Sequence, residues 1–228
     1  FRPDWSAYQP PKPSFLGTRV YDHWSLEELA RYIDWTPFFQ TWEMKGRFPA
    51  ILEDEKQGAA ARALWDDAQV MLARIIDDKW FSPKAVVGFW PAQAAGDDIR
   101  LFTDEGRSAE LATFFTLRQQ TWKREGRPNT ALADFVSPSA PDYVGGFVVT
   151  AGVEEQEIAQ RFERANDDYS AILVKALADR FAEAFAERLH EHVRKELWGY
   201  APDEVYAPAD LIGEPYRGIR PAPGYPAQ

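Results

Sequence analysis

The chain contains no cysteine among its 228 residues. It can therefore form no disulfide, no thiolate nucleophile and no cysteine-ligated zinc site. No apolar run approaches the roughly 20 residues that a membrane-spanning helix needs, so we expect no membrane insertion. The first residues are proline-rich and polar, unlike a secretory signal. These absences are typical of a protein of the cytoplasm.

Common catalytic and nucleotide-binding signatures are also missing. The chain has no Gly-x-Gly-x-x-Gly turn, no phosphate-binding P-loop and no Gly-x-Ser-x-Gly elbow. It has three histidines, His23, His190 and His192. The last two are two residues apart on an expected helix, so they point in nearly opposite directions and cannot share a metal. We therefore predict no catalytic residue, no metal site and structural roles for the histidines.

The charge balance is acidic, with 26 Lys and Arg against 36 Asp and Glu, a net charge of −10. No basic patch stands out, so we expect no nucleic-acid partner. The excess of carboxylates favours a cationic ligand or a basic partner surface. The hydrophobic content of 45% and the nine tryptophans are sufficient for a sizeable core.

Sequence periodicity predicts an α+β fold. We expect helices over residues 25–34, 54–79, 108–125, 154–164 and 168–198, and strands over 85–92, 99–104, 131–136 and 143–152. Short strands separated by helices favour a largely antiparallel sheet. The prediction is a single domain that begins with an extended arm over residues 1–24 and ends with one long helix followed by an extended tail.

Three places carry candidate functional residues. Asp34 lies at the expected end of the first helix, where the helix dipole opposes a carboxylate. Glu183 lies beside the apolar stripe of the long helix. Arg220 begins the tail motif Arg-Pro-Ala-Pro-Gly-Tyr-Pro, whose prolines favour extended chain, and its planar guanidinium suits a carboxylate or a phosphate. The ordinary alternatives are a surface acid, a solvated helix face and a surface strap.

Several strings of the sequence resemble the activation domain of cobalamin-dependent methionine synthase. They are YIDWTPFF (32–39), VVGFWPAQAAGDDI (86–99), LADFV (132–136), FVVTAG (147–152), DDYSAILVKALADRFAEAFAERLHEHVRKELWGYAPDE (167–204) and GIRPAPGYPA (218–227). The resemblance covers residues 25–228 and is most specific in the pairing of IDWTPFF with RPAPGYP. It implies a helmet-like domain around a twisted antiparallel sheet. That family continues past the tail motif, so the resemblance also implies that the C-terminal portion of the domain is lacking.

The resemblance implies a methyltransferase module that binds S-adenosylmethionine (AdoMet). In that family, the module supplies the methyl group that returns oxidised cobalamin to methylcobalamin. The implied partners are a cobalamin-binding domain of the same enzyme and a flavodoxin-like electron donor. An alternative interpretation is that the chain is a non-catalytic docking module, which binds the cobalamin domain or the reductant without using AdoMet. The presence of both Asp34 and Arg220 favours the first reading.

The same resemblance assigns the ligand-binding residues. Asp34 holds the amino group of AdoMet, and Arg220 takes its carboxylate. The remaining residues offer backbone atoms or line the same region, and they are Ala222, Gly224, Tyr225, Glu183 and Glu214. A carboxylate and an arginine together suit a zwitterionic amino-acid group.

Overall fold

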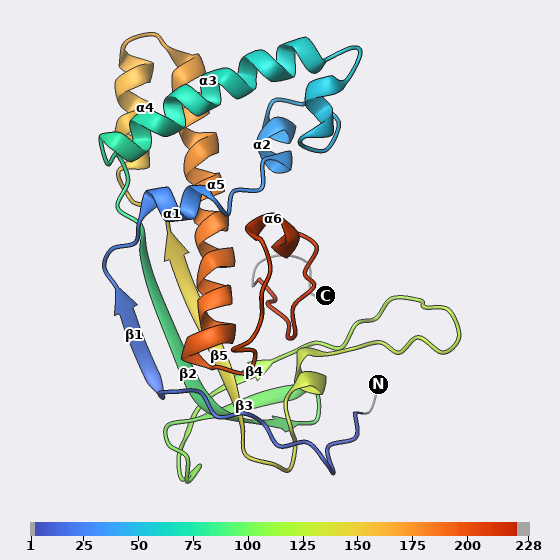
Figure 1. The fold of residues 1–228 in the computed structure, drawn as a ribbon. Coiled ribbons are helices and arrows are strands. Elements are labelled where there is room, and N and C mark those ends of the chain that lie inside the picture. The colour runs from blue at the N-terminus through green and yellow to red at the C-terminus, as the bar shows by residue number, and fades with distance from the viewer. Residues whose placement is uncertain (1–2, 223–228) are drawn as a thin grey trace.

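The computed structural model describes residues 3–222. Gly224 and Tyr225 of the tail motif therefore lie outside the described residues. One layer is a five-stranded antiparallel sheet, and most of the helices gather at one end of it (Figure 1). The strands are β1 (Gly17–Tyr21), β2 (Lys84–Ala95), β3 (Asp98–Phe102), β4 (Glu110–Phe115) and β5 (Asp142–Thr150). This arrangement confirms the predicted α+β class.

Strand β2 organises the sheet. Its first half pairs with β1 and its second half with β3, while β5 runs along its opposite edge and β4 extends the sheet beyond β3. Gly145 of β5 lies opposite Phe89, and a Cβ at this glycine would come within 2.9 Å of the Phe89 ring. The glycine thus leaves room for the aromatic ring to lie across the sheet. β1 belongs to the sheet although it falls within the N-terminal 24 residues.

The helices are α1 (Leu26–Ala30), α2 (Thr36–Thr41), α3 (Gly58–Asp77), α4 (Glu155–Arg164), α5 (Asp168–His192) and α6 (Pro208–Leu211). Short 3₁₀ turns cover Ala50–Glu53 and Leu132–Phe135, and a π-helical turn over Val193–Leu197 follows α5. Within the described residues, none of these helices is both long and apolar enough to cross a lipid bilayer.

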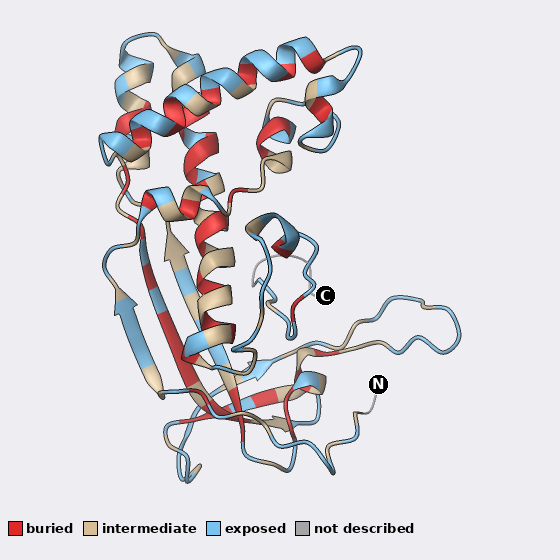
Figure 2. Cartoon of the chain, viewed as in Figure 1, coloured by how far each residue is buried: buried red, intermediate tan, exposed pale blue. Residues whose placement is uncertain are grey.

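Helix α5 is the central packing element. The Asp167 side chain caps it by accepting the Ser170 N–H at 3.0 Å, which satisfies a donor that the helix cannot pair internally. Leu177, Phe181 and Phe185 are fully buried in the main hydrophobic core, which also includes residues of α1, α2, α3 and α4. Figure 2 shows this buried stripe continuing along α5.

The predicted helix over residues 108–125 is wrong. Residues 110–115 form β4, and residues 116–131 form a loop that projects from the sheet (Figure 1). Leu111 and Phe115 have the i, i+4 spacing of a helical stripe, but both are exposed, and their segment instead hydrogen-bonds to the edge of β3. The helical spacing of the apolar residues was therefore misleading, because pairing with strand β3 determined the structure of this segment.

The predicted strand over residues 131–136 is also wrong, because residues 132–135 form a 3₁₀ turn. Asp134 stabilises that turn by accepting the Ala131 N–H at 2.9 Å. Its carboxylate also accepts two hydrogen bonds from Arg118, at 2.7 and 2.8 Å. Arg118 in turn bonds to Asp97, so the base of the projecting loop is fixed to the β2–β3 turn.

Candidate functional site

The C-terminal segment, residues 201–222, runs back along the second half of α5. Three contacts establish its direction: Glu204 bonds to Arg194, Tyr216 packs on His190, and Arg220 bonds to Glu187. As the segment advances, its partners move from Arg194 in the π-helical turn after α5 back to His190 and then Glu187 on α5. Arg220 is thereby returned to the last two turns of the long helix.

A buried cation anchors this segment. The Arg194 side chain is 0% exposed, and it donates from Nε to Glu204 Oε2 at 2.9 Å and from Nη2 to Glu204 Oε1 at 2.6 Å. Its guanidinium also lies 3.9 Å from the centre of the Tyr216 ring. A desolvated cation–π contact and a two-point ion pair are both strongly directional. The segment is therefore held in one position four residues before Arg220.

His190 completes the anchor from α5. Arg194 Nη1 donates to His190 Nδ1 at 2.8 Å, so the ring carries its proton on Nε2. Burial, together with the positive charges of Arg194 and Arg220, lowers the pKa of His190 to about 3. The imidazole is therefore neutral at physiological pH and serves as a hydrogen-bond acceptor.

Arg220 is paired to a residue that the sequence did not single out. Its Nη2 donates to Glu187 Oε2 at 2.8 Å, and the two side chains are 25% and 14% exposed. Within residues 3–222, neither Arg220 Nε nor Glu187 Oε1, both buried, has a hydrogen-bond partner. Burial raises the pKa of Glu187, although the nearby Arg220 and Arg194 oppose the shift. The Arg220–Glu187 pair thus has one hydrogen bond and one unpartnered buried atom on each residue, and it lies at the edge of the surface that the C-terminal segment covers.

Three further predicted residues lie around this pair. Glu214 is exposed, and its charge contributes to raising the pKa of Glu187 and of Tyr216. Glu183 is exposed one helical turn before Glu187. Ala222 is exposed at the end of the described residues. The structure therefore brings Arg220 and Glu214 to one place and puts Glu183 on the adjacent turn of α5.

Asp34 is placed differently from the sequence expectation. Helix α1 ends at Ala30, so Asp34 is not at a helix C-terminus. It instead precedes α2, and its Oδ1 accepts the Thr36 N–H at 2.9 Å. Its carboxylate forms no ion pair with any of residues 3–222. α2 packs on α5 and lies on the same side of that helix as α6 in Figure 1.

The wall beside Asp34 is aromatic, as the sequence predicts. The Trp35 ring lies 4.6 Å from the Trp65 ring and 5.4 Å from the Phe38 ring, both edge to face. These contacts fix the connection between α1 and α2 against α3. Asp34 therefore lies on a loop that is packed against α3 through the adjacent Trp35.

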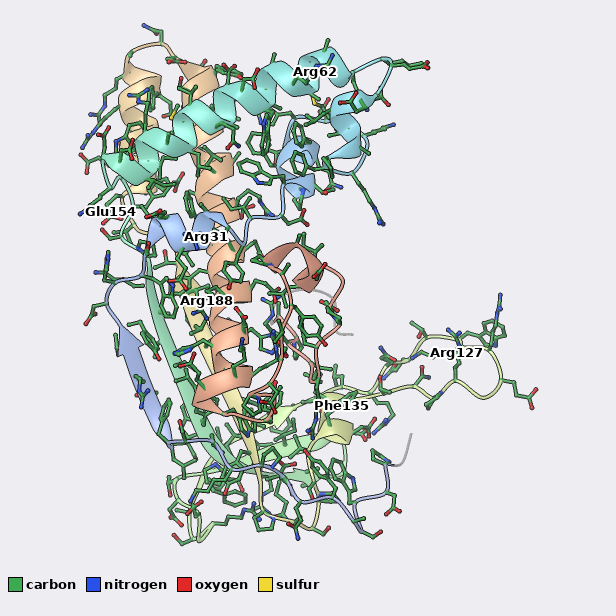
Figure 3. All side chains as sticks on the ribbon, viewed as in Figure 1. Arg31, Arg62, Arg127, Phe135, Glu154 and Arg188 are labelled. Carbon is green, nitrogen blue, oxygen red and sulfur yellow. The ribbon has the colours of Figure 1, made fainter. Side chains whose placement is uncertain are left out.

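A separate cleft of about 350 Å³ opens where α1 crosses α5. Figure 3 marks Arg31 and Arg188 at this cleft. Its charges are largely paired with one another, because Arg188 Nε donates to Glu28 at 2.6 Å and the Tyr32 hydroxyl donates to Glu191 at 2.6 Å. Among the described residues, none of the predicted ligand-binding residues lines it. Across residues 3–222, no group of three or more histidine and acidic side chains is arranged to hold a metal ion.

Sequence reasoning missed Glu187, Arg194 and Tyr216. One signal was available, since Glu183, Glu187 and Glu191 follow one another at i, i+4 spacing on α5. Like charges at that spacing repel, so such a row indicates either a solvated face or a cationic cover. The structure shows a cationic cover over the middle member.

The domain is thus an α+β sheet-and-helix unit in which Arg220 of the C-terminal segment returns to the partly buried Glu187 carboxylate on the long helix. Residues 25–228 match the protein family described as vitamin B12 dependent methionine synthase, activation domain. A crystal structure described as the MetH reactivation domain bound to AdoHcy is 52% identical, with a TM-score of 0.94. The alignment covers 100% of this chain and 70% of that one. The chain belongs to the activation-domain family of vitamin B12-dependent methionine synthase.

Proposed function

We propose that this domain binds AdoMet at Arg220 and Asp34 and presents its methyl group for reactivation of the enzyme's cobalamin. Arg220 takes the ligand carboxylate and Asp34 takes its ammonium group. Glu183 and Glu214 border the site with their negative charges, and Ala222, Gly224 and Tyr225 belong to the strip that contacts the ligand.

The main support is the solved relative, which is 52% identical over the whole of this chain and carries AdoHcy. AdoHcy is AdoMet without its transferable methyl group, so it has the same amino-acid end. Arg220 also supports the proposal, because its bond to Glu187 uses one Nη2 hydrogen and leaves further guanidinium donors for a ligand carboxylate.

The absence of catalytic signatures fits this chemistry. AdoMet supplies an activated methyl group, and its transfer from a sulfonium requires no proton abstraction by the protein. The site residues need only bind the zwitterionic amino-acid end of AdoMet, orient the ligand and accommodate its sulfonium cation. An acidic chain with a net charge of −10 is suited to the last task.

The partners follow from the proposed reaction. Cobalamin is held by another domain of the enzyme, which approaches this one during reactivation, and a flavodoxin-like protein supplies the electron. The whole enzyme transfers a methyl group to homocysteine in methionine biosynthesis, and we place it in the cytoplasm, in keeping with the cysteine-free sequence. The non-catalytic docking module is not favoured, because the solved relative carries a nucleoside ligand.

Calorimetric titration of the full-length protein with AdoMet tests the proposal. We expect saturable binding of one AdoMet per domain, competition by AdoHcy, and weaker binding of decarboxylated AdoMet. Equal affinity for AdoMet and its decarboxylated analogue would contradict the assigned role of Arg220. Absence of AdoMet binding would contradict the proposed function as a whole.

A further inference from the structure

The Arg220–Glu187 pair joins elements of very different rigidity. Glu187 lies in the interior of the 25-residue helix α5, and its neighbours Phe185 and Leu189 are fully buried in the core. Arg220 lies on a segment without regular secondary structure. The carboxylate is therefore the fixed member of the pair, and the arginine takes its position from it.

The direction of the guanidinium depends on this contact. The anchor formed by Arg194 and Tyr216 fixes the backbone four residues earlier, and Tyr216 also interacts with the Arg220 side chain, but neither residue offers Arg220 a carboxylate that would set the plane of its long, flexible guanidinium. Of the five N–H donors of Arg220, the Nη2 bond to Glu187 is the one that reaches a carboxylate within residues 3–222. A planar fork binds a second carboxylate well only when its plane is already set.

The contact also leaves donors for a ligand. Glu187 uses one oxygen, so the pair is one hydrogen bond short of a two-point arrangement, and Arg220 Nε and Glu187 Oε1 are the buried atoms that would complete it. Completing that bond uses the Nε and Nη2 edge of the guanidinium. The Nη1 nitrogen and the second Nη2 hydrogen then remain for an incoming carboxylate.

We propose that Glu187 is a positioning residue that orients Arg220 and thereby sets the selectivity of the site for ligands with an α-carboxylate. This inference rests on the proposed function, because it assumes that Arg220 reads the carboxylate of AdoMet. Glu187 acts through Arg220 and does not need to touch the ligand. A competing carboxylate, by contrast, would bind Arg220 in the free protein and would have to release it before the ligand could bind.

The test compares AdoMet with decarboxylated AdoMet in four forms of the full-length protein. They are the wild type, Glu187→Ala, Glu187→Gln and the control Glu157→Gln. The control removes a carboxylate that forms an exposed ion pair with Arg161 on α4, with side chains 67% and 65% exposed. Dissociation constants are measured by calorimetry, and melting curves establish that each form is folded. Glu187→Gln is isosteric and keeps the comparison possible if the alanine variant does not fold.

We expect Glu187→Ala to weaken AdoMet binding about tenfold, the scale of one charge-assisted hydrogen bond, and to leave the analogue within about twofold. Glu187→Gln should fall between wild type and alanine, because its amide oxygen still accepts from Arg220. The control should match the wild type. In an Arg220→Ala background, Glu187→Ala should cause no further loss, since the residue it orients is gone.

Three results would overturn the inference while leaving the proposed function intact. Tighter AdoMet binding by Glu187→Ala would make Glu187 a competitor. Equal weakening of both ligands would make it a structural residue. Unchanged affinities, with wild-type protein still discriminating between the ligands, would give it no role. If the wild type bound AdoMet but Arg220→Ala changed nothing, the proposed ligand assignment would fail, and this inference with it.

Discussion

Helix α5 buries two faces of opposite chemical character. One face carries Leu177, Phe181 and Phe185, each 0% exposed, and packs into the main hydrophobic core. The other face, near the end of the helix, carries Glu187 and His190 and continues into Arg194 of the following π-helical turn, beneath the C-terminal segment. The same helix therefore contributes a core surface on one side and a covered ionic surface on the other.

The two faces have different roles: the apolar face stabilises the fold, and the ionic face positions the C-terminal segment. Burying apolar area stabilises the fold by about 25 cal/mol per Å². Burying ions costs desolvation energy that a good pair only offsets, so a hydrophobic replacement of the same shape is often no less stable. The ionic face is therefore better explained by geometry, because it holds the segment that delivers Arg220. Breaking each face in turn should reveal this division.

The apolar face should give the largest loss of stability. Phe185→Ala removes a fully buried ring and should cost about 3–5 kcal/mol of unfolding free energy, measured by urea denaturation. No second truncation should restore the loss, because it comes from a cavity. A cost below about 1 kcal/mol would show that the helix is not packed as described.

The ionic face should give a similar loss that can be rescued. Arg194→Leu leaves Glu204 buried without its partner and should cost about 3–5 kcal/mol in the same assay. Adding Glu204→Leu removes the orphaned charge and should recover most of the loss. AdoMet affinity should stay reduced in the double variant, since the anchor is absent. Full recovery of binding would contradict a placement role for this face.

Asp34→Asn should change binding more than folding. The asparagine oxygen can still accept the Thr36 N–H, so stability should hardly move. Loss of the negative charge should weaken AdoMet binding by about 1–3 kcal/mol, the scale of a hydrogen bond to a charged group. Calorimetry and a melting curve distinguish the two effects. Loss of stability with binding intact would make Asp34 a structural cap.

His190 should give a small, pH-dependent effect. Its pKa is lowered from 6.5 to about 3 on folding, so between those values the unfolded chain binds the extra proton. Its contribution is therefore complete above pH 6.5 and is lost as the pH falls towards 3, with a slope of at most about 1.4 kcal/mol per pH unit. His190→Gln, which keeps an acceptor for Arg194, should show a shallower acid slope. An NMR titration of His190 near its ordinary pKa would contradict the prediction.

Local signals predicted the elements whose partners are close in sequence. The Asp167 cap and the apolar stripe predicted α5, and the turn after Ala95 predicted the β2–β3 hairpin. The prediction of a helix over residues 108–125 failed because its helical spacing was coincidental and residues 110–115 pair with the edge of β3. Nothing local reveals that an edge strand will be available.

The candidate site was predictable only in part, because some of its contacts join residues that are far apart in the sequence. The family motifs singled out Arg220 and Asp34, but the partner of Arg220 is 33 residues away on a helix face that a sequence pattern assigns to solvent. Glu187 is covered only because the chain reverses after α5 and returns antiparallel to it. That reversal depends on the buried Arg194 and its contact with Glu204, which is a tertiary arrangement.

The central claim is that the ionic face of α5 delivers Arg220 to a ligand carboxylate. The most direct test is the affinity of Arg220→Ala for AdoMet and for decarboxylated AdoMet, measured by calorimetry in the full-length protein. We predict a loss of about 1.5–3 kcal/mol for AdoMet and almost none for the analogue, in a variant whose melting curve shows that it is folded. Equal weakening of both ligands would contradict the claim and would reduce the tail to a structural strap.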